Sequence, residues 1–294
     1  MTIPTLPTDE AAPRRGRFFR TMMSRPGTVI AAAFVIVLVI VAVFAPILAP
    51  FDPYTQDLAN RLQSPNSTHL LGTDDYGRDA LSRLIYGSRI SMTAALQAVV
   101  LAIVLGLPLG VIAGYVGGWV DSTLTRVMDA LMSAPSLVLA ITIVAVLGSG
   151  ITNAMLAVGL VMTPRFFRVA RATTMDVRYE TYIEAATALG CKPSRVIIRH
   201  ILPNVMPPTV LVVSVSLGAA VAAEASLSFL GLGAKPPAAS WGSMLSTAAS
   251  NMQQAAYLVW PPGVMIFFTV LAFTYLGDGV RRALLRSRNG NDDS

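Results

Sequence analysis

Long apolar runs separated by short charged segments dominate the chain. Runs long enough to cross a bilayer as a helix, which takes about 20 residues, lie at about residues 29–48, 90–113, 124–147, 153–172, 205–232 and 257–276. The stretch 130–164 has no charged residue and is too long for one helix, and the turn-forming sequence "GSGITN" at 148–153 divides it. The pattern predicts an all-α polytopic membrane protein with six transmembrane helices.

Composition supports lipid as the main solvent of the chain. Hydrophobic residues make up 54% and charged residues 13%, against about a quarter charged in soluble domains. The net charge of +6 comes from basic residues beside the apolar runs, so it indicates membrane topology rather than nucleic-acid binding. With the N-terminus inside, 17 of the 22 Lys and Arg residues lie on the cytoplasmic side. The sequence therefore predicts cytoplasmic N- and C-termini.

The N-terminal region has two interpretations. Its first 25 residues are polar and contain arginine, as the start of a signal peptide does. The apolar run at 27–51 is longer than the apolar part of a usual signal peptide, and it lacks a small-residue cleavage site. We therefore expect a retained membrane helix. The single cysteine, Cys191, excludes an internal disulfide.

The segment "YETYIEAATALGCKPSRVIIRHILPN" (179–204) is a compact helical unit between two apolar runs. Thr181 and Glu184 fit a capping box. Gly190 suits a left-handed helix end, and Pro193 suits the first position of a new helix. We expect a helix of about two turns, a glycine bend and a second helix that stops before Pro203 and leads into the fifth span.

One face of this unit carries two alanines between a tyrosine and a leucine. Tyr182, Ala185, Ala186 and Leu189 fall on one side of the first helix. An amphipathic connection lying on the membrane is one interpretation. Alanines and a glycine suit close docking into a groove of a partner protein better than insertion among lipid headgroups, so we favour docking.

The stretch "EAATALGCKPSRVIIRHILPN" resembles the EAA signature of ABC-importer permeases, E-A-A-x-x-x-G followed by H-x-L-P. In that family this loop is the coupling helix that sits in a cleft of a cytoplasmic ATPase. The resemblance implies ATPase-coupling roles for the following residues: Tyr182, Glu184, Ala185, Ala186, Leu189, Gly190, His200 and Pro203.

Further blocks resemble the C-type permease subunit of dipeptide, oligopeptide and nickel importers. They are "HLLGTDDYGRDALSRLIYGSRIS" (69–91), "GYVGGWVD" (114–121), "EASLSFLGLG" (224–233), "PPAASWGSML" (236–245) and "LGDGVRRAL" (276–284). The resemblance covers roughly residues 17–286. It implies the type I ABC-importer permease fold in a bacterial inner membrane, and a non-catalytic subunit that forms half of a pathway for di- or oligopeptides.

The implied partners follow from the same resemblance. They are a homologous B-type permease, an extracytoplasmic peptide-binding protein and two cytoplasmic ATPase domains, separate or fused. The chain lacks the phosphate-binding pattern G-x-x-x-x-G-K-[ST]. We therefore expect no cofactor on this chain, and ATP and Mg on the ATPase subunits.

The resemblance also divides the chain. Residues 1–26 form a cytoplasmic tail, and residues 27–89 hold the first span and an extracytoplasmic segment. Residues 90–280 form the permease core with five spans and the coupling loop at about 176–204. Residues 281–294 form a second cytoplasmic tail.

Glu224 lies within the fifth span, where an acid is costly and is a functional hypothesis by default. Contact with the translocation path and a hydrogen bond between helices are both open.

Arg165, Arg168 and Arg171 lie three residues apart at the inner end of the fourth span. Anchoring at the cytoplasmic interface is favoured for them, and contact with the ATPase, Glu184 or Asp176 is the alternative. We expect solvated or capping roles for Asp129 and Asp278.

The extracytoplasmic segment carries the charged run Asp74, Asp75, Arg78 and Asp79. Contact with a solute receptor or gating of the pore entrance is the hypothesis, and no ligand spacing supports a metal site. Leu81, Leu84 and Ile85 predict a short helix on the outer surface. Residues 234–257 form a second outer element.

Three alternative functions remain. A nickel or other small-solute importer permease would carry the same sequence blocks. An ion-coupled carrier would favour several intramembrane ionisable residues or internal repeats, but only Glu224 is a deep acid and no repeat is visible. A membrane enzyme is disfavoured because H-E-x-x-H is missing and the two histidines, His69 and His200, fall on opposite sides of the membrane.

Overall fold

The computed structural model describes residues 25–289, so the predicted tail at 1–26 lies almost wholly outside them. These residues form helices and turns, with no strand among them. The α-helices are α2 (Pro26–Val43), α3 (Ala45–Leu48), α4 (Ala80–Val116), α5 (Gly118–Ser133), α6 (Ser136–Leu147), α7 (Ile151–Arg178), α8 (Thr181–Ala188), α9 (Pro193–Val196), α10 (Leu202–Phe229), α11 (Trp241–Ser250), α12 (Met252–Ala255) and α13 (Trp260–Asn289). Short turns lie at Leu58–Asn60, Ile197–Ile201 and Ala256–Val259.

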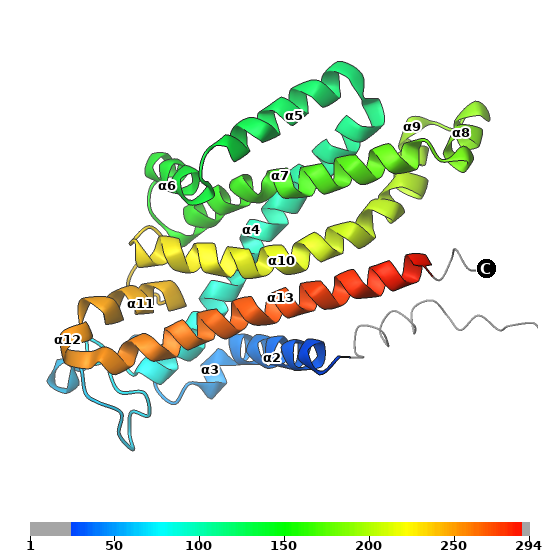
Figure 1. The fold of residues 1–294 in the computed structure, drawn as a ribbon. Coiled ribbons are helices and arrows are strands. Elements are labelled where there is room, and N and C mark those ends of the chain that lie inside the picture. Colours follow the sequence, from blue (N-terminus) through cyan, green and yellow to red (C-terminus); the bar gives the residue numbers. More distant parts are fainter. Residues whose placement is uncertain (1–24, 290–294) are drawn as a thin grey trace, which may run out of the picture.

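The long helices form an elongated bundle with two distinct ends (Figure 1). Helix α10 packs against α4, α7 and α13, and α13 packs against α2. Helices α8 and α9 lie at one end, together with the start of α2 and the end of α13 (Figure 1). Helices α11 and α12 and the segment before α4 lie at the other end (Figure 1). The predicted cytoplasmic loop and the outer segment are thus at opposite ends.

Four helical stretches are long and apolar enough to cross a membrane: Pro26–Val43, Ala80–Val116, Pro193–Phe229 and Met252–Arg282. A fifth is added if α5 and α6, which are bent by 94° relative to each other, count as one span. Helix α7 holds the predicted fourth span and is long enough, but its arginines and other polar residues lower its mean hydropathy. The count of six and the side on which the termini lie stay predictions.

The predicted third span at 124–147 is not one continuous helix. Helix α5 ends at Ser133, Ala134 is extended, and α6 begins after Pro135. Proline disfavours the helical conformation of the residue before it. The sequence pattern showed an uninterrupted apolar run but not that this proline bends it.

The helix expected over Leu81, Leu84 and Ile85, leading into the second span, forms as the continuous start of that span. Helix α4 starts at Ala80 and continues for 37 residues to Val116, with Pro108 inside it. Leu81, Leu84 and Ile85 therefore belong to the first turns of the membrane helix itself.

Glycines allow α4 and α7 to pack closely. A Cβ atom at Gly110 would lie 2.4 Å from the carbonyl oxygen of Phe167, and one at Gly106 would lie 2.6 Å from that of Thr163. Small residues at such positions bring helix backbones together in membranes. The pair α4–α7 is thus a tightly fitted unit whose two helices reach the end of the bundle that carries α8.

Candidate functional site

Helix α8 begins one residue away from the predicted cap. Glu180 is extended and occupies the N-cap position, without a side-chain hydrogen bond to the helix, and Thr181 is already in the first turn. The expected capping box of Thr181 and Glu184 is therefore wrong. The motif spacing was present, but the backbone turns into the helix before the threonine.

The bend after α8 has the predicted form. Gly190 has a φ of +80°, and the amide of Cys191 donates to the carbonyl of Ala186 at 3.1 Å. A left-handed glycine closing a helix in this way is a common C-terminal motif. Pro193 then occupies the first turn of α9, which confirms the predicted restart.

The expected stop before Pro203 is wrong. The chain passes from α9 through a wide π turn at Ile197–Ile201 directly into α10, with Pro203 in its first turn. The coupling loop is thus joined to α10 without a break.

Only Ile183 anchors α8 to the bundle deeply. Its side chain is 2% exposed and packs with Val111 of α4, Ala170 of α7 and Val205 of α10. Ile183 therefore belongs to a buried apolar cluster that includes residues of α4, α7 and α10.

The opposite side of α8 is open. Leu189 is 86% exposed and Tyr182 47% exposed, while Glu184 and Ala185 are exposed and Ala186 is half-buried. We call this set of residues the coupling face: Tyr182, Glu184, Ala185, Ala186, Leu189 and Gly190. An exposed leucine and tyrosine beside small residues are typical of a surface that another protein covers.

Two signature residues that are distant in sequence meet beside this face. The rings of Tyr182 and His200 lie 6.0 Å apart. Asn204 donates to the His200 carbonyl at 2.7 Å and to the Tyr182 hydroxyl at 3.4 Å. Pro203 is exposed next to them. The structure therefore gathers the signature residues at one end of the molecule.

Glu224 is buried between helices, with 1% of its surface exposed. Ser91 of α4 donates to one carboxylate oxygen at 2.9 Å, and Ser228 donates to the other at 2.6 Å. The backbone amide of Trp241, at the start of α11, donates to the Ser91 hydroxyl at 3.2 Å. Both oxygens of Glu224 are thus occupied by contacts within the chain. Sequence reasoning found the acid but not its partners, Ser91 on α4 and Ser228 one turn later on α10.

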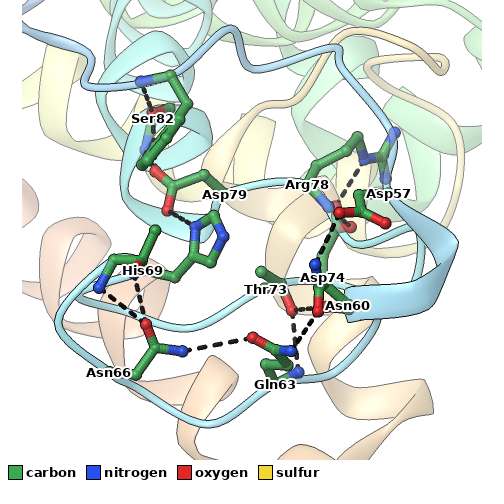
Figure 2. Close-up of polar contacts among 12 residues, drawn as sticks. Asp57, Asn60, Gln63, Asn66, His69, Thr73, Asp74, Arg78, Asp79 and Ser82 are labelled. Atoms are coloured by element: carbon green, nitrogen blue, oxygen red, sulfur yellow. Dashed lines mark hydrogen bonds and ion pairs between the residues drawn. The ribbon is translucent and has the colours of Figure 1, made fainter.

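The charged run of the outer segment points inward (Figure 2). Asp74 receives the Nε–H of Arg78 at 2.7 Å and lies 3.1 Å from Nε of Arg83. Asp74, Arg78 and Arg83 are 7%, 5% and 7% exposed. Contact with a receptor or gating of the pore entrance stays a prediction for this segment. In the structure the side chains of Asp74 and Arg78 pair with each other and hold the segment together.

Asp79 caps α4 and holds the outer segment to it (Figure 2). Its carboxylate accepts the amide of Ser82 at 2.8 Å and the hydroxyl of Ser82 at 2.7 Å, and it lies 2.9 Å from Nδ1 of His69. Arg83 donates to the carbonyl of Pro53 at 2.9 Å. The roles of His69 and Arg83 were missed in the sequence. The spacing of Asp79 and Arg83 over the first helical turn was the available signal.

Asp75 is the least satisfied acid of this segment. Burial is the main cause that raises the pKa of its carboxyl, the charge of Asp74 adds to this, and Arg78 opposes it. Its Oδ1 is buried without a hydrogen bond, 3.7 Å from Nη2 of Arg78.

Arg168 and Arg171 of α7 pair with α5 rather than with Glu184 or Asp176. Arg168 donates to Asp129 at 2.7 Å. Arg171 binds Asp121 through two bonds, with Nη2 donating to Oδ2 at 2.6 Å. Asp129 is exposed, as expected from the sequence, and it also forms an ion pair between helices that the sequence did not indicate.

Comparisons with known proteins agree with this architecture. Residues 106–289 match the family described as "Binding-protein-dependent transport system inner membrane component". Residues 15–65 match the "N-terminal TM domain of oligopeptide transport permease C".

Full-length relatives and a solved structure extend these matches. The glutathione transport system permease protein GsiD of Shigella flexneri is 41% identical over 96% of this chain and 93% of its own length. GsiD of an Escherichia coli strain is 40% identical over the same shares. A chain from an inward-facing structure of the MetNI methionine ABC transporter aligns with a TM-score of 0.57 at 19% identity, over 68% of this chain and 95% of that chain.

The helical fold and the matching sequence blocks together define a multi-pass permease component of an ABC importer. The chain belongs to the family of binding-protein-dependent transport system inner membrane components. This confirms the resemblance stated from the sequence, including its C-type assignment. The family name itself implies a binding-protein partner and a place in the inner membrane.

Proposed function

We propose that this chain is the permease subunit of an ATP-driven importer for di- or oligopeptides. The observation that carries the proposal is the 41% identity to a glutathione permease over nearly the whole chain, together with the oligopeptide-type N-terminal match. Glutathione is itself a small peptide, so the relative's solute falls within the class expected from the sequence.

The chain supplies one half of the pathway, and a homologous B-type permease supplies the other half. Two cytoplasmic ATPase domains bind ATP and Mg and supply the energy, because this chain has no phosphate-binding loop of its own. An extracytoplasmic peptide-binding protein delivers the solute. The exposed coupling face, with Leu189 86% exposed, supports a protein partner at the α8 end.

Coupling runs through α8. When the ATPase domains close on ATP, they move the coupling face, and the movement passes through the buried apolar cluster that Ile183 shares with residues of α4, α7 and α10. The unbroken connection from α9 into α10 gives the movement a second route. These helices reach the opposite end of the bundle, where Glu224 ties α10 to α4 and α11.

Uptake measurements test the solute class. Labelled dipeptide, tripeptide including glutathione, longer peptide and nickel are offered to cells with and without this chain. Loss of peptide uptake supports the proposal, and the lengths lost define the range. Loss of nickel uptake alone assigns the chain to metal import, and no change for any solute rejects the peptide proposal.

Two variants test the coupling route. Gly190→Val and the double variant Ala185→Asp/Ala186→Asp should insert normally but lose solute-stimulated ATP hydrolysis and uptake. The matched control is Gly231→Val. Gly190 (φ +80°) and Gly231 (φ +79°) both have left-handed backbones, and no atom lies within 4 Å of an added Cβ at either position. The backbone strain of the substitution is therefore similar at the two sites, about 1–2 kcal/mol. Normal coupling in Gly190→Val, or equal loss in both glycine variants, contradicts the role of α8.

A further inference from the structure

Three of the four arginines of α7, at positions 165, 168 and 171, have different surroundings. Arg171 and Arg168 are held by Asp121 and Asp129 of α5. Arg165 is exposed and has no ion-pair partner among residues 25–289. It is also the arginine of this series that lies furthest from the α8 end.

Arg165 lies near the middle of its helix. At a rise of about 1.5 Å per residue, it is about 21 Å from Ile151 and about 20 Å from Arg178. The predicted fourth span, 153–172, contains Arg165 about 10 Å from its inner end at this rise, and the hydrocarbon core is about 30 Å thick, so we place Arg165 within the spanning part of α7. Charged side chains at such positions face the bundle interior or water rather than lipid.

Helix α5 presents a matching set of polar side chains. Ser122, Arg126, Asp129 and Ser133 are exposed, and their spacing of four, three and four residues places them on one helical face. Arg126 has no ion-pair partner among the described residues.

The ion pair Arg168–Asp129 joins this face to the exposed side of α7, where Arg165, Arg168, Ala172 and Asp176 fall on one face in the same way. We call the combined surface the polar face. Its members are Ser122, Arg126, Asp129 and Ser133 of α5 and Arg165, Arg168, Ala172 and Asp176 of α7.

The outer surfaces of α2 and α13 are different. Ile30 and Ile36 of α2 are 68% and 60% exposed, and Phe267 of α13 is 61% exposed. These surfaces suit contact with lipid chains. The polar face does not, because each exposed charge in lipid costs about 2.5–3.5 kcal/mol or more.

We propose that the polar face lines the water-filled path of the importer, and that Arg126 and Arg165 attract a carboxylate group of the passing solute. This inference rests on the proposed function. Tight packing against a partner permease would bury unpaired guanidinium groups, which is strongly unfavourable. An aqueous path keeps them hydrated until a solute carboxylate replaces water with charge-assisted hydrogen bonds.

Thiol labelling tests the water path. The only native cysteine, Cys191, is replaced by serine, and single cysteines are placed at Ser122, Ser133 and Arg165 in the membrane-embedded complex. Cysteines at Ile36 and Phe267 are the lipid-facing controls. A charged thiol reagent needs a thiolate in water, so the polar-face cysteines should react about tenfold faster or more. Rates as slow as the controls at all three positions overturn the proposal.

Charge selection tests Arg165 directly. In Arg165→Gln, uptake per ATP hydrolysed should fall about tenfold for a peptide with a free carboxylate, in line with the loss of a hydrogen bond to a charged group. For each peptide, uptake by the variant is divided by uptake by the wild type. Comparing this quotient for the free and the amidated peptide cancels any preference of the binding protein. Arg165→Lys should restore most of the uptake. Equal losses for both peptides contradict carboxylate recognition.

Failure of the proposed function and failure of the present inference give different experimental results. If the wild-type complex shows no ATP-driven peptide uptake, the peptide-importer proposal fails, while labelling still reports whether water reaches the polar face. If wild-type uptake is normal and the polar face is unreactive, only the present inference fails.

Discussion

The outer segment and the coupling loop look alike in sequence but differ in structure. Both are polar stretches between apolar runs, and both were expected to contact partner proteins. In the outer segment the charged residues Asp74, Arg78 and Asp79 are 7%, 5% and 3% exposed. In the coupling loop the apolar residue Leu189 is 86% exposed. Charge is turned inward at one end of the molecule, and apolar surface is turned outward at the other.

This difference shows which of the two segments holds its structure without a partner protein. Apart from Asp75, the outer segment satisfies its charges through Asp74, Asp79, Arg83 and the carbonyl groups of neighbouring loops. The coupling loop has one deep anchor, Ile183, and an uncovered face. We therefore expect substitutions in the outer segment to change stability and substitutions on the coupling face to change partner binding.

The largest expected effect is at Asp74. Asp74→Asn leaves the buried guanidinium groups of Arg78 and Arg83 without their shared charge, and breaking a buried pair costs about 3–5 kcal/mol. Thermal unfolding of the purified protein should show this loss, whereas the exposed control Arg61→Ala should change the free energy of unfolding by less than about 0.5 kcal/mol. Equal stability of the two variants would mean that the network does not hold the segment.

The second effect is at Leu189. Leu189→Asp should leave stability nearly unchanged, because the side chain is exposed, but weaken ATPase binding about tenfold or more, as loss of a central interface contact does. Co-purification and titration of the ATPase measure this. Leu70→Asp is the matched control at the opposite end, since Leu70 is 62% exposed. Unchanged ATPase affinity in Leu189→Asp would show that the coupling face is not the docking surface.

Local signals predicted the elements of the coupling loop. Gly190 and Pro193 each act on the backbone within a turn of their own position, so the bend and the restart could be found from sequence. The cap of α8 shifted by one residue, because motif spacing does not fix where the preceding chain turns into the helix.

Contacts between distant segments could not be predicted in this way. The bond between Ser91 and Glu224 spans 133 residues, and the bond between Arg83 and Pro237 spans 154. An aspartate exposed in a loop and an aspartate buried under a loop have the same local pattern. The partners decide between them, and the partners are set by the packing of α4, α10 and α11.

The third and smaller effect is expected from substitution of Glu224. This residue extends the comparison of the outer segment and the coupling loop to a buried acid within a predicted span. Glu224→Ala leaves Ser91 and Ser228 without their acceptor and should lower stability by about 1–3 kcal/mol. Glu224→Gln keeps the shape and one acceptor, so uptake should persist. Loss of uptake in Glu224→Gln with unchanged thermal stability would instead assign the residue to the translocation path.

The smallest effect concerns Asp75 and depends on pH. Burial raises the pKa of this carboxyl in the folded protein, so the folded state binds a proton more readily than the unfolded state does. The free energy of unfolding therefore falls as pH rises through the interval between the unfolded and folded pKa values. Asp75→Asn removes this loss. The variant should be the more stable protein at neutral pH, and its advantage should shrink as the solution is made acid enough to protonate Asp75 in both states. A constant difference across the titration of unfolding temperature against pH would show that Asp75 is as well accommodated as its neighbours, and that the outer segment satisfies all of its charges.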